Sequence, residues 1–363
     1  MCRYCHNLAF YVATYYISLQ HTTMSLAKPI LVVLGATGTQ GGSVLAHFLS
    51  LSPSPYALRG VTRDLSSAKA AALIAQGVEM VVGNFDDPTS LEAAFKGASA
   101  IYSVTDYWNP MADPLQHQKA AAAGQSIGHF IREYETQQNK NIIDAAANLD
   151  GLERFIFSSL PDTKKLSSGK YTHVFQFDSK GIAEEYGRQT HPKLWAKTSV
   201  FYAPFYLENY FGPLGALFRP KLDKSKGSLT LAIAEPLAST PLPWFSAVGD
   251  TGALVYALLR AAPGKKLIGV RELLSPRQLA ELFAETLEKG IEFIGHVSSS
   301  GSDDSDITKG LADLMGWCVE FGYDGAKVDQ NIVTPEDLGV PVALGSVKEW
   351  FQKQDWDQFL QLS

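Results

Sequence analysis

Cysteine is scarce in this sequence. The 363 residues include three cysteines, too few for a disulfide framework, which favours a reducing compartment. Cys2, Cys5 and His6 spell C-x-x-C-H, the attachment pattern of a c-type haem. We reject that interpretation, because the pattern starts at the second residue and no export signal precedes it. Two cysteines and one histidine also fall short of a closed zinc site.

Long hydrophobic runs and excess positive charge are also missing. The apolar segment 8–19 is about a dozen residues long, whereas a helix needs about 20 to cross a bilayer. The net charge of -6 gives no broad positive field for nucleic acid. We therefore expect no membrane or direct nucleic-acid contact, and a cytoplasmic location with the nucleus as the alternative. Any gene-regulatory role would act through a partner protein. Residues 1–27 are expected to be a disordered extension; the alternative is that residues 1–23 come from an upstream start included in error, since Met24 opens M-S-L-A-K-P directly before the first strand.

What the sequence does contain is an apolar strand that runs directly into glycines and then a helix. Within residues 29–49, Gly35, Gly38 and Gly41 form G-x-x-G-x-x-G. One glycine permits the tight turn, another lets the backbone approach a pyrophosphate, and the last brings the helix close to the strand. The first N–H groups of the helix are then free to bind an anion. With its strand and helix in place, the motif predicts dinucleotide binding.

Strands and helices alternate through the first half of the chain. Further strands are expected at 56–61, 79–82, 100–104, 154–158 and 196–201. Helices are expected at 67–76, 91–95 and 174–189, and one or two helices at 115–147, where Gly124 and Gly128 loosen the middle. The alternation predicts an α/β fold, a Rossmann-like doubly wound parallel sheet with helices on both faces.

The pattern changes beyond residue 205. Prolines interrupt short segments there, as expected where the chain forms the wall of a pocket. We expect a dinucleotide-binding domain at 28–205, with 206–363 mainly a smaller, substrate-facing α+β region packed on it. Ser275 and Gln278 predict a capping box for a helix that ends at Gly290. Helices are also expected at 311–321 and 347–360, and a polar loop at 298–306.

The tip of the second strand indicates which cofactor is bound. Proteins that select NAD usually place an acidic side chain about 20 residues beyond the glycines, where it binds the ribose hydroxyls. Here residues 61–64 read V-T-R-D, and the planar cation of Arg63 suits a 2′-phosphate. Thr62, Ser66 and Ser67 are small donors nearby. The sequence therefore favours NADP over NAD.

Taken together, these residues make the chain similar to the NmrA-like family, atypical members of the short-chain dehydrogenase/reductase superfamily. The similarity runs from about Ile30 to near the C-terminus. Its most specific segments are G-A-T-G-T-Q-G-G-S-V at 35–44, V-T-R at 61–63, V-T-D-Y-W at 104–108, F-D-S-K-G at 177–181 and Y-L-E-N at 206–209. The resemblance implies a Rossmann-like fold and an NADP(H)-dependent oxidoreductase.

The resemblance also implies a cofactor site. Its residues would be Gly35, Ala36, Thr37, Gly38, Thr39 and Gln40 at the pyrophosphate, Arg63, Asp64, Leu65, Ser66 and Ser67 at the adenosine phosphate, Asn84 and Phe85 at the adenine, and Thr105, Asp106, Tyr107, Lys180, Tyr206, Leu207, Glu208 and Asn209 on the nicotinamide side. The chain departs from the family at Asn84, where aspartate is common, and at Asp106, where asparagine is frequent. A buried Asp106 would disfavour an anionic substrate, and an exposed one would matter little.

Lys180 is the strongest catalytic candidate. Related reductases place a lysine here, against the nicotinamide ribose, where its charge also assists a proton donor. Their donor is a tyrosine four residues earlier, but this chain has Gln176 there, and glutamine supplies no proton at neutral pH. Either Lys180, Tyr107 or Tyr206 donates the proton, or the site binds cofactor without turnover.

Other residues are weaker candidates. Ser158 or Ser159, at the end of the fifth strand, matches the usual substrate-orienting serine only loosely, and a simple strand-end turn explains it equally well. Aromatic residues expected in the core or the pocket wall are Tyr186, Trp195 and Trp244. His173 and His191 have no partner at metal-ligand spacing, so no metal site is expected.

The leading hypothesis is a reductase that uses NADP(H) to reduce a carbonyl or an activated double bond of a small, mostly apolar molecule. The alternative is a non-catalytic redox sensor that binds NADP(H) and regulates a partner protein such as a transcription factor. Gln176 favours the alternative, whereas Lys180 is compatible with both.

Overall fold

The computed structural model of the chain describes residues 28–212, 215, 217–295 and 305–356. Three predictions lie wholly or partly outside these ranges. They are the extension at 1–27 with its C-x-x-C-H pattern, most of the polar loop at 298–306, and the end of the helix predicted at 347–360.

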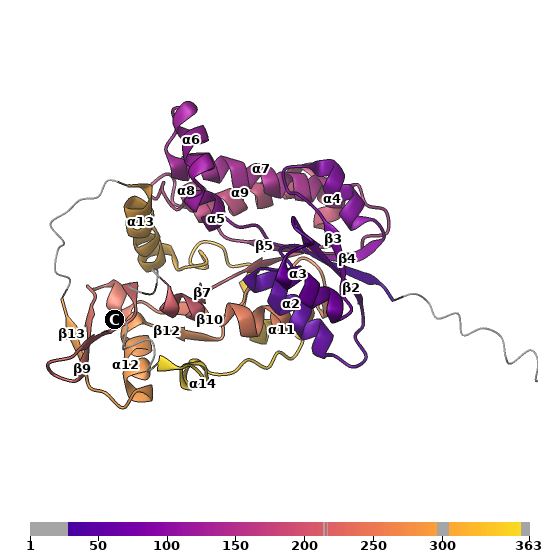
Figure 1. Ribbon diagram of the computed structural model, residues 1–363. Coiled ribbons are helices and arrows are strands. Elements are labelled where there is room, and N and C mark those ends of the chain that lie inside the picture. The colour runs from indigo at the N-terminus through magenta and orange to yellow at the C-terminus, as the bar shows by residue number, and fades with distance from the viewer. Residues whose placement is uncertain (1–27, 213–214, 216, 296–304, 357–363) are drawn as a thin grey trace, which may run out of the picture.

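An eight-stranded sheet forms the centre of the molecule (Figure 1). Its strand order is β14-β11-β6-β5-β4-β1-β2-β3, and all neighbouring pairs are parallel. The strands are β1 Ile30–Val33, β2 Ala57–Thr62, β3 Glu79–Val82, β4 Ala98–Ser103, β5 Arg154–Ser159, β6 Thr198–Tyr202, β11 Lys266–Ile268 and β14 Ile332–Val333. The central strands β4, β5 and β6 are almost wholly buried, as strands covered on both faces must be. The predicted Rossmann-like α/β fold is confirmed.

Helices cover both faces of this sheet (Figure 1). The first face is covered by α2 and α11, which pack on Leu31, Val33 and Ile156 of the strands. The other is covered by α4, α7 and α9, which enclose Val32 and Phe155. The bounds are α2 Thr39–Ser50, α3 Ala68–Ala75, α4 Pro88–Phe95, α7 Ile127–Ala147, α9 Phe175–Thr190 and α11 Ala247–Arg260. Successive strand residues point to opposite faces, so these runs of apolar residues supply both layers of the core.

The chain beyond residue 205 builds a second, smaller set of layers. Two three-stranded sheets, β12-β10-β7 and β13-β9-β8, pack with α12, α13 and α14 around an aromatic core that includes Tyr210, Trp244 and Trp317. The bounds are β7 Phe205–Tyr206, β8 Lys221–Asp223, β9 Ser228–Ala232, β10 Leu242–Phe245, β12 Glu272–Leu274, β13 Ile291–Ile294, α12 Pro276–Thr286, α13 Asp306–Phe321 and α14 Val347–Gln352. This half also returns to the central sheet, since β11 and β14 form one of its edges.

Several observed bounds differ from the sequence predictions. The stretch 115–147, expected to form one or two helices, forms two, α6 (Pro114–Ala122) and α7, because Gly124 turns the chain with a φ of +66°. The predicted capping box of Ser275 and Gln278 is confirmed, but α12 ends at Thr286, before Gly290.

The last two helices also differ from their predictions. α13 begins at Asp306, inside the predicted loop, where Ser305 caps it, and α14 ends at Gln352. Four short helices complete the helical elements used below: α5 Trp108–Ala112, α8 Thr163–Leu166, α10 Pro192–Trp195 and the 3-10 turn η1 Leu207–Phe211. Among the described residues, none of the helices has the length and apolar character needed to cross a membrane.

Candidate cofactor and substrate site

The glycine-rich loop joins β1 to α2 where the strand order reverses, between β1 and β4. Gly35 has a φ of +61°, which side-chain-bearing residues rarely adopt. A Cβ on Gly41 would lie 2.3 Å from the Gly35 carbonyl oxygen, so only glycine allows this close approach. Gly38 caps α2 without a side chain, and the first turn carries no acidic residue. The N–H groups of that turn are therefore available to an anion, where a dinucleotide places its pyrophosphate.

The tip of β2 presents side chains that suit a phosphate. Arg63 is exposed and makes no hydrogen bond or ion pair with any described residue. Asp64 instead accepts hydrogen bonds from the Ser66 hydroxyl and N–H at 2.6 and 2.8 Å, and these lower the pKa of its carboxyl. The Asp64 carboxylate therefore binds within its own loop and does not pair with Arg63, whose guanidinium group faces solvent.

A second cation approaches the glycine-rich loop from α3. Ser67 caps this helix by accepting from the Ala70 N–H at 3.3 Å, and Lys69 in the first turn donates from Nζ to the Thr37 carbonyl at 3.2 Å. Leu65 lies exposed in the turn before the helix. Sequence reasoning missed Lys69, although its place in the first turn after Arg63 was a usable signal.

The predicted adenine end follows β3. Asn84 is exposed, and its Oδ1 accepts from the Asp86 N–H at 3.1 Å. Phe85 is half-buried, and its carbonyl accepts from Nδ2 of Asn141 at 2.9 Å. Tyr134 of α7 also donates to the Asp86 carboxylate at 2.6 Å. The segment is therefore fixed to α7, with the Asn84 amide at the surface.

The Gln40 side chain ties the glycine-rich loop to three strands. Its Oε1 accepts from the hydroxyls of Tyr102 in β4 and Ser158 in β5, and its Nε2 donates to the hydroxyl oxygen of Tyr206 in β7. Gln40 is 8% exposed, so this network lies beneath the loop. Of the two candidate serines, Ser158 joins the site, because Ser159 turns its hydroxyl to the carbonyl that follows it in the chain.

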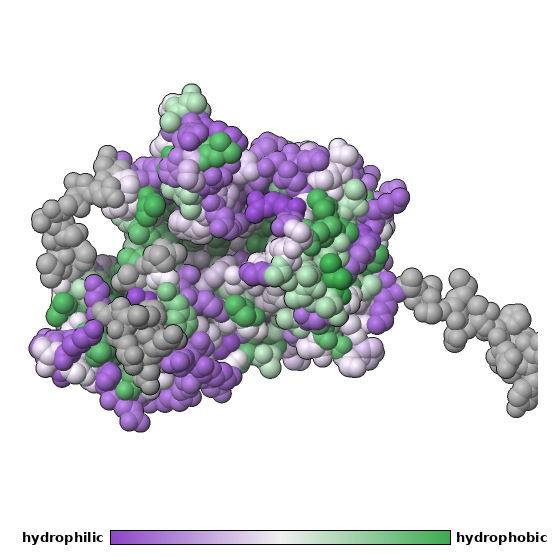
Figure 2. Space-filling model, viewed as in Figure 1, coloured by the Kyte–Doolittle hydropathy of each residue, from purple (hydrophilic) through white to green (hydrophobic). Residues whose placement is uncertain are grey.

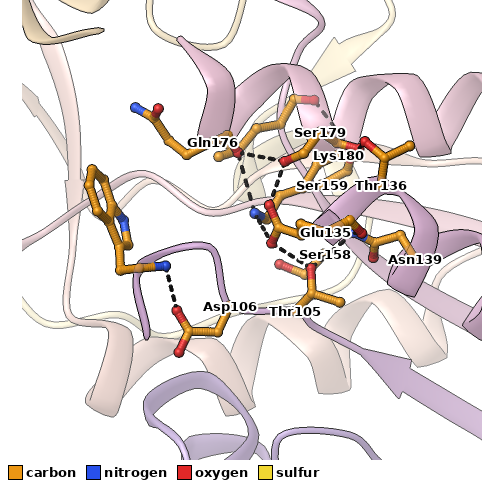
Figure 3. Close-up of polar contacts among 12 residues, drawn as sticks. Thr105, Asp106, Glu135, Thr136, Asn139, Ser158, Ser159, Gln176, Ser179 and Lys180 are labelled. Carbon is orange, nitrogen blue, oxygen red and sulfur yellow. Dashed lines mark hydrogen bonds and ion pairs between the residues drawn. The ribbon is translucent and has the colours of Figure 1, made fainter. Parts of the chain in front are cut away.

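Figure 3 shows a second polar cluster, centred on Glu135 of α7. Lys180 Nζ and the Thr105 hydroxyl donate to its Oε1 at 2.6 and 2.7 Å. The Ser179 hydroxyl donates to Oε2, and Asn139 donates to the Thr105 hydroxyl at 3.0 Å. Glu135 is fully buried and Lys180 is 8% exposed, so this ion pair is shielded from water.

Sequence reasoning identified Lys180 but missed Glu135 and Asn139. Both face the same side of α7 as the buried Ile131 and Ile142, a spacing typical of the inward stripe of a helix. A carboxylate on such a stripe requires a buried partner, and Lys180 supplies it. The signal was therefore present in the helical periodicity.

Asp106, predicted on the nicotinamide side, caps α5. Its carboxylate accepts from the N–H groups of Trp108 and Asn109 at 2.9 and 3.3 Å. Asp106 is exposed, so the expectation for an exposed Asp106 applies, and its charge does little to exclude an anionic substrate.

Tyr107 and Gln176 both lie near the Glu135 cluster. The Tyr107 hydroxyl donates to the Gly128 carbonyl at 3.3 Å, and burial, followed by the nearby Glu135 charge, raises its pKa. The Gln176 carbonyl accepts from Lys180 Nζ at 3.3 Å, but its side-chain amide points away from Glu135 and Lys180 (Figure 3).

The resemblance assigned the segment after β7 to the nicotinamide side. Leu207 is fully buried in the core. Glu208 anchors α11, because its two carboxylate oxygens accept from the Ser246 hydroxyl at 2.6 Å and from the next two backbone N–H groups at 2.9 and 3.1 Å. Asn209 is half-buried, and of these three residues it is the one that lines a pocket.

That pocket lies between Trp108 of α5, Gln176 of α9 and residues of the second set of layers. Its volume is about 50 Å³, and none of the described residues that line it is charged. Aromatic and aliphatic side chains dominate its wall, among them Trp108, Phe205, Phe218, Trp244 and Leu314. The polar groups of its described lining are the amides of Gln176 and Asn209, the hydroxyls of the tyrosines, and the indole N–H groups of Trp108 and Trp244. Figure 2 shows a hollow on this face with hydrophobic side chains inside it.

A larger and more open depression of about 540 Å³ lies elsewhere, between α7, α8 and α9. Its wall is charged, with Arg132, Lys164 and Asp178 among its residues, and none of them belongs to the glycine-rich loop. Burial raises the pKa of Asp178 to about 6. One of its oxygens accepts from the Thr163 hydroxyl and N–H and from the Lys164 N–H, which caps α8.

The remaining candidates have the structural roles that were expected. The Tyr186 hydroxyl donates to Asp144 at 2.7 Å, and this bond raises its pKa to about 12. Trp195 packs in the core and Trp244 in the pocket wall. The two candidate histidines each pair with one aspartate. In the part of the chain that the structure describes, no cluster of three or more His, Cys, Asp or Glu side chains could hold a metal.

The strand order, the glycine-rich turn at the reversal point and the clusters at the ends of β4 and β5 define a Rossmann-like protein with its site at the carboxyl ends of the strands. The chain belongs to the NmrA-like family, whose sequence model matches residues 27–333. The family resemblance drawn from the motifs is confirmed.

Relatives and solved structures agree with this placement. The NmrA-like family domain-containing oxidoreductase cpsB of Aspergillus campestris is 27% identical over 285 residues, which cover 75% of this chain and 77% of the relative. NmrA, described as a negative transcriptional regulator, has been solved with NADP (TM-score 0.60, 20% identity, 92% and 94% of the two chains covered) and with NAD (TM-score 0.59). The Citrobacter sp. triphenylmethane reductase complexed with NADP(H) gives a TM-score of 0.58 at 19% identity, with 90% and 99% covered. At these identities the structural likeness shows the fold.

Proposed function

We propose that this protein is an NADP(H)-dependent oxidoreductase that reduces a carbonyl or an activated double bond of a small, uncharged, mostly apolar molecule. One observation carries the proposal: the pocket is lined by Gln176, whose carbonyl accepts from Lys180 Nζ, and by Tyr206, whose hydroxyl accepts from Gln40 after the glycine-rich loop. These contacts lie near the carboxyl ends of β4 and β5. In a doubly wound sheet, dinucleotide ligands bind at this edge. Relatives named as oxidoreductases and structural neighbours solved with NADP support it.

The residues present fit NADPH. A Cβ would fill the cradle at Gly41, and the first turn of α2 offers its N–H groups to a pyrophosphate. Arg63 and Lys69 would hold the 2′-phosphate, since both cations stand at the β2 tip and the loop. When bound, NADPH supplies a hydride to the substrate.

Lys180 would bind the nicotinamide ribose by donating hydrogen bonds from its ammonium group. Glu135 fixes its ammonium group at 2.6 Å, and Thr105 and Ser179 satisfy further lone pairs of that carboxylate. The pair adds no net charge to the site. An uncharged substrate therefore meets no uncompensated charge in the pocket wall or at Lys180.

The size of the pocket adds a requirement for substrate entry. Its volume of about 50 Å³ is well below the roughly 300–1,000 Å³ of most small-molecule pockets. Lining side chains must therefore move when a substrate binds. Trp108, which is 43% exposed on the short helix α5, is placed to do so.

A turnover assay tests this proposal. Purified protein with NADPH and a panel of ketones, aldehydes, enones and imines should show a substrate-dependent loss of nicotinamide absorbance. Lys180→Ala should lower that rate at least about tenfold. Lys96→Ala, which removes an exposed lysine at the end of α4, should leave it unchanged. Undiminished turnover in Lys180→Ala would show that the role given to Lys180 is wrong.

A redox sensor is the second candidate, and Gln176 is the residue that favours it, because it stands where related reductases carry their tyrosine. NmrA, a neighbour in fold, is described as a transcriptional regulator. A sensor would bind NADPH tightly, show no turnover with the carbonyl panel, and change its affinity for a partner protein between NADP+ and NADPH. For either candidate we propose a cytoplasmic location, and for the sensor an action through that partner, since a net charge of -6 gives no field for nucleic acid.

A further inference from the structure

Tyr206 carries a hydroxyl group that donates no hydrogen bond to any described residue. Its oxygen accepts a hydrogen bond from Nε2 of Gln40. The other end of that amide, Oε1, accepts from the hydroxyls of Tyr102 and Ser158, the latter at 3.0 Å. Two hydroxyl donors on Oε1 orient the amide with Nε2 toward Tyr206. Within the described ranges, the phenolic hydrogen of Tyr206 has no acceptor, so it is available to a ligand.

The position of Tyr206 places this hydrogen at the reacting end of the site. Gln40 belongs to the first turn of α2, and its partners Tyr102 and Ser158 lie in β4 and β5. These strands are on the far side of the reversal point from β2, the strand whose tip holds the adenosine phosphate, so the nicotinamide half of a dinucleotide lies over them. Tyr206 also lines the uncharged pocket together with Gln176.

Two other tyrosines near this edge have hydroxyls that are already engaged. The Tyr107 hydroxyl donates to the Gly128 carbonyl at 3.3 Å, and its ring packs with Met111 and Ile131 in a separate apolar cluster. Tyr210, the second tyrosine of the pocket wall, donates to the Phe218 carbonyl at 3.3 Å. Neither hydroxyl is free to act on a ligand in the pocket.

We propose that Tyr206 is the catalytic acid of this site and replaces the tyrosine missing at position 176, with Gln40 as its positioning residue. The assignment rests on the proposed reductase function. As the substrate carbon accepts the hydride, its π bond to oxygen breaks and the electron pair moves to that oxygen. The Tyr206 O–H bond then breaks, the proton passes to the substrate oxygen, and water returns a proton to the phenolate.

The surroundings of Tyr206 keep its hydroxyl group protonated. Burial is the largest cause that raises the pKa of Tyr206 to about 12; the Gln40 hydrogen bond works against it, and the carboxylates of Glu208 and Asp106 add to it. The other titratable groups that interact with it are the phenols of Tyr102 and Tyr323. Tyr206 is therefore protonated at neutral pH and can give its proton to a developing alkoxide, which is the stronger base.

A titration with the two forms of the cofactor tests the placement without any need for turnover. The nicotinamide ring is positively charged in NADP+ and neutral in NADPH. A nearby positive charge favours phenolate, so saturating NADP+ should lower the pH at which Tyr206 ionises by roughly one unit, and NADPH should not. Phenolate absorbance after rapid pH jumps, read before unfolding begins, gives the signal as the difference between wild type and Tyr206→Phe.

Two variants complete the test. Tyr206→Phe keeps the ring, which packs against Phe245 at a centroid distance of 5.3 Å, and should preserve folding and NADPH affinity while lowering kcat about 100-fold or more. Tyr186→Phe removes a hydroxyl that donates to Asp144 of α7, away from the pocket lining. It should change neither the NADP+-dependent shift nor kcat.

Each outcome decides a different claim. A shift with NADP+ and a loss of kcat in Tyr206→Phe support the assignment. The absence of an NADP+-dependent shift would overturn the placement of Tyr206, whatever the turnover, and undiminished kcat in Tyr206→Phe would overturn its acid role. If no substrate is turned over by wild type, the proposed function and the acid role both fail. The titration then still reports whether the phenol faces the ring.

Discussion

Replacement of Glu135 by glutamine should destabilise the protein strongly through its effect on Lys180. The change keeps the size of the side chain but removes the charge that lies 2.6 Å from Lys180 Nζ. Glu135 is fully buried and Lys180 is 8% exposed, so solvent screens the remaining charge little. Loss of one partner of a buried ion pair typically costs about 3–5 kcal/mol, because the other charge stays buried without compensation.

The loss of unfolding free energy has an upper bound, because an unpaired buried lysine can lose its proton and become neutral. Deprotonation of a lysine side chain with the ordinary pKa of about 10.4 costs about 4.6 kcal/mol at neutral pH. The glutamine oxygen can still accept from the Thr105 hydroxyl, so that contact adds little to the loss. We therefore expect Glu135→Gln to lower the free energy of unfolding by about 3–4.6 kcal/mol.

Urea unfolding at pH 7 with linear extrapolation measures this loss. Glu133→Gln is the matched control, because Glu133 lies on the same helix with its side chain 52% exposed, and it should change the unfolding free energy by less than about 0.5 kcal/mol. The double variant Glu135→Gln/Lys180→Met should recover most of the loss, since no charge is left unpaired. The reasoning is refuted if Glu135→Gln costs no more than the control, or if the two changes are simply additive.

Three further predictions concern the cofactor site and the α8 cap. Arg63→Ala should weaken NADPH binding about tenfold more than NADH binding, because the lost hydrogen bonds are to a phosphate, and equal losses in fluorescence titrations would exclude a phosphate clamp. Gly41→Ala should abolish NADPH binding, since its Cβ would lie 2.3 Å from the Gly35 carbonyl, whereas Gly42→Ala, with its nearest contact at 3.6 Å, should bind normally. Calorimetry that finds equal binding in both would contradict this. Burial raises the pKa of Asp178 to about 6. Between about pH 4 and 6 the folded protein therefore holds a proton that the unfolded chain has released. Folding stability should fall by about 3 kcal/mol as the pH rises through that range. Asp178→Asn should flatten this part of the pH-stability curve in urea unfolding, and an unchanged slope would count against it.

The parts of the fold and site that depend on local pattern could be predicted from the sequence. Gly35, Gly38 and Gly41 follow a buried apolar strand, and the geometry of the loop allows only glycine at Gly41. Ser275 and Gln278 form the predicted capping box because both halves of that motif lie within one turn. The alternation of strands and helices likewise required covering layers on both faces of the sheet.

Contacts between distant segments could not be predicted in the same way. Glu208 was assigned to the nicotinamide by family resemblance, but its carboxylate caps α11, and nothing in the local sequence marks that helix start as its partner. The bond between Gln40 and Tyr206 joins residues 166 positions apart. Glu135 is the intermediate case, since helical periodicity placed it inward while its partner Lys180 depended on how α7 and α9 pack.

The return of the chain to its first sheet makes the two halves of this protein inseparable. A fragment that stops at residue 205 would lack β11, which pairs with β6. β6 would then be an edge strand whose unpaired backbone N–H and C=O groups could pair with another molecule. It would also lack α11, so Leu31, Val33 and Phe201 would meet water on one side. Expression of the nucleotide-binding half alone should therefore give insoluble material, and engineering of this scaffold has to retain the whole chain at least through β14.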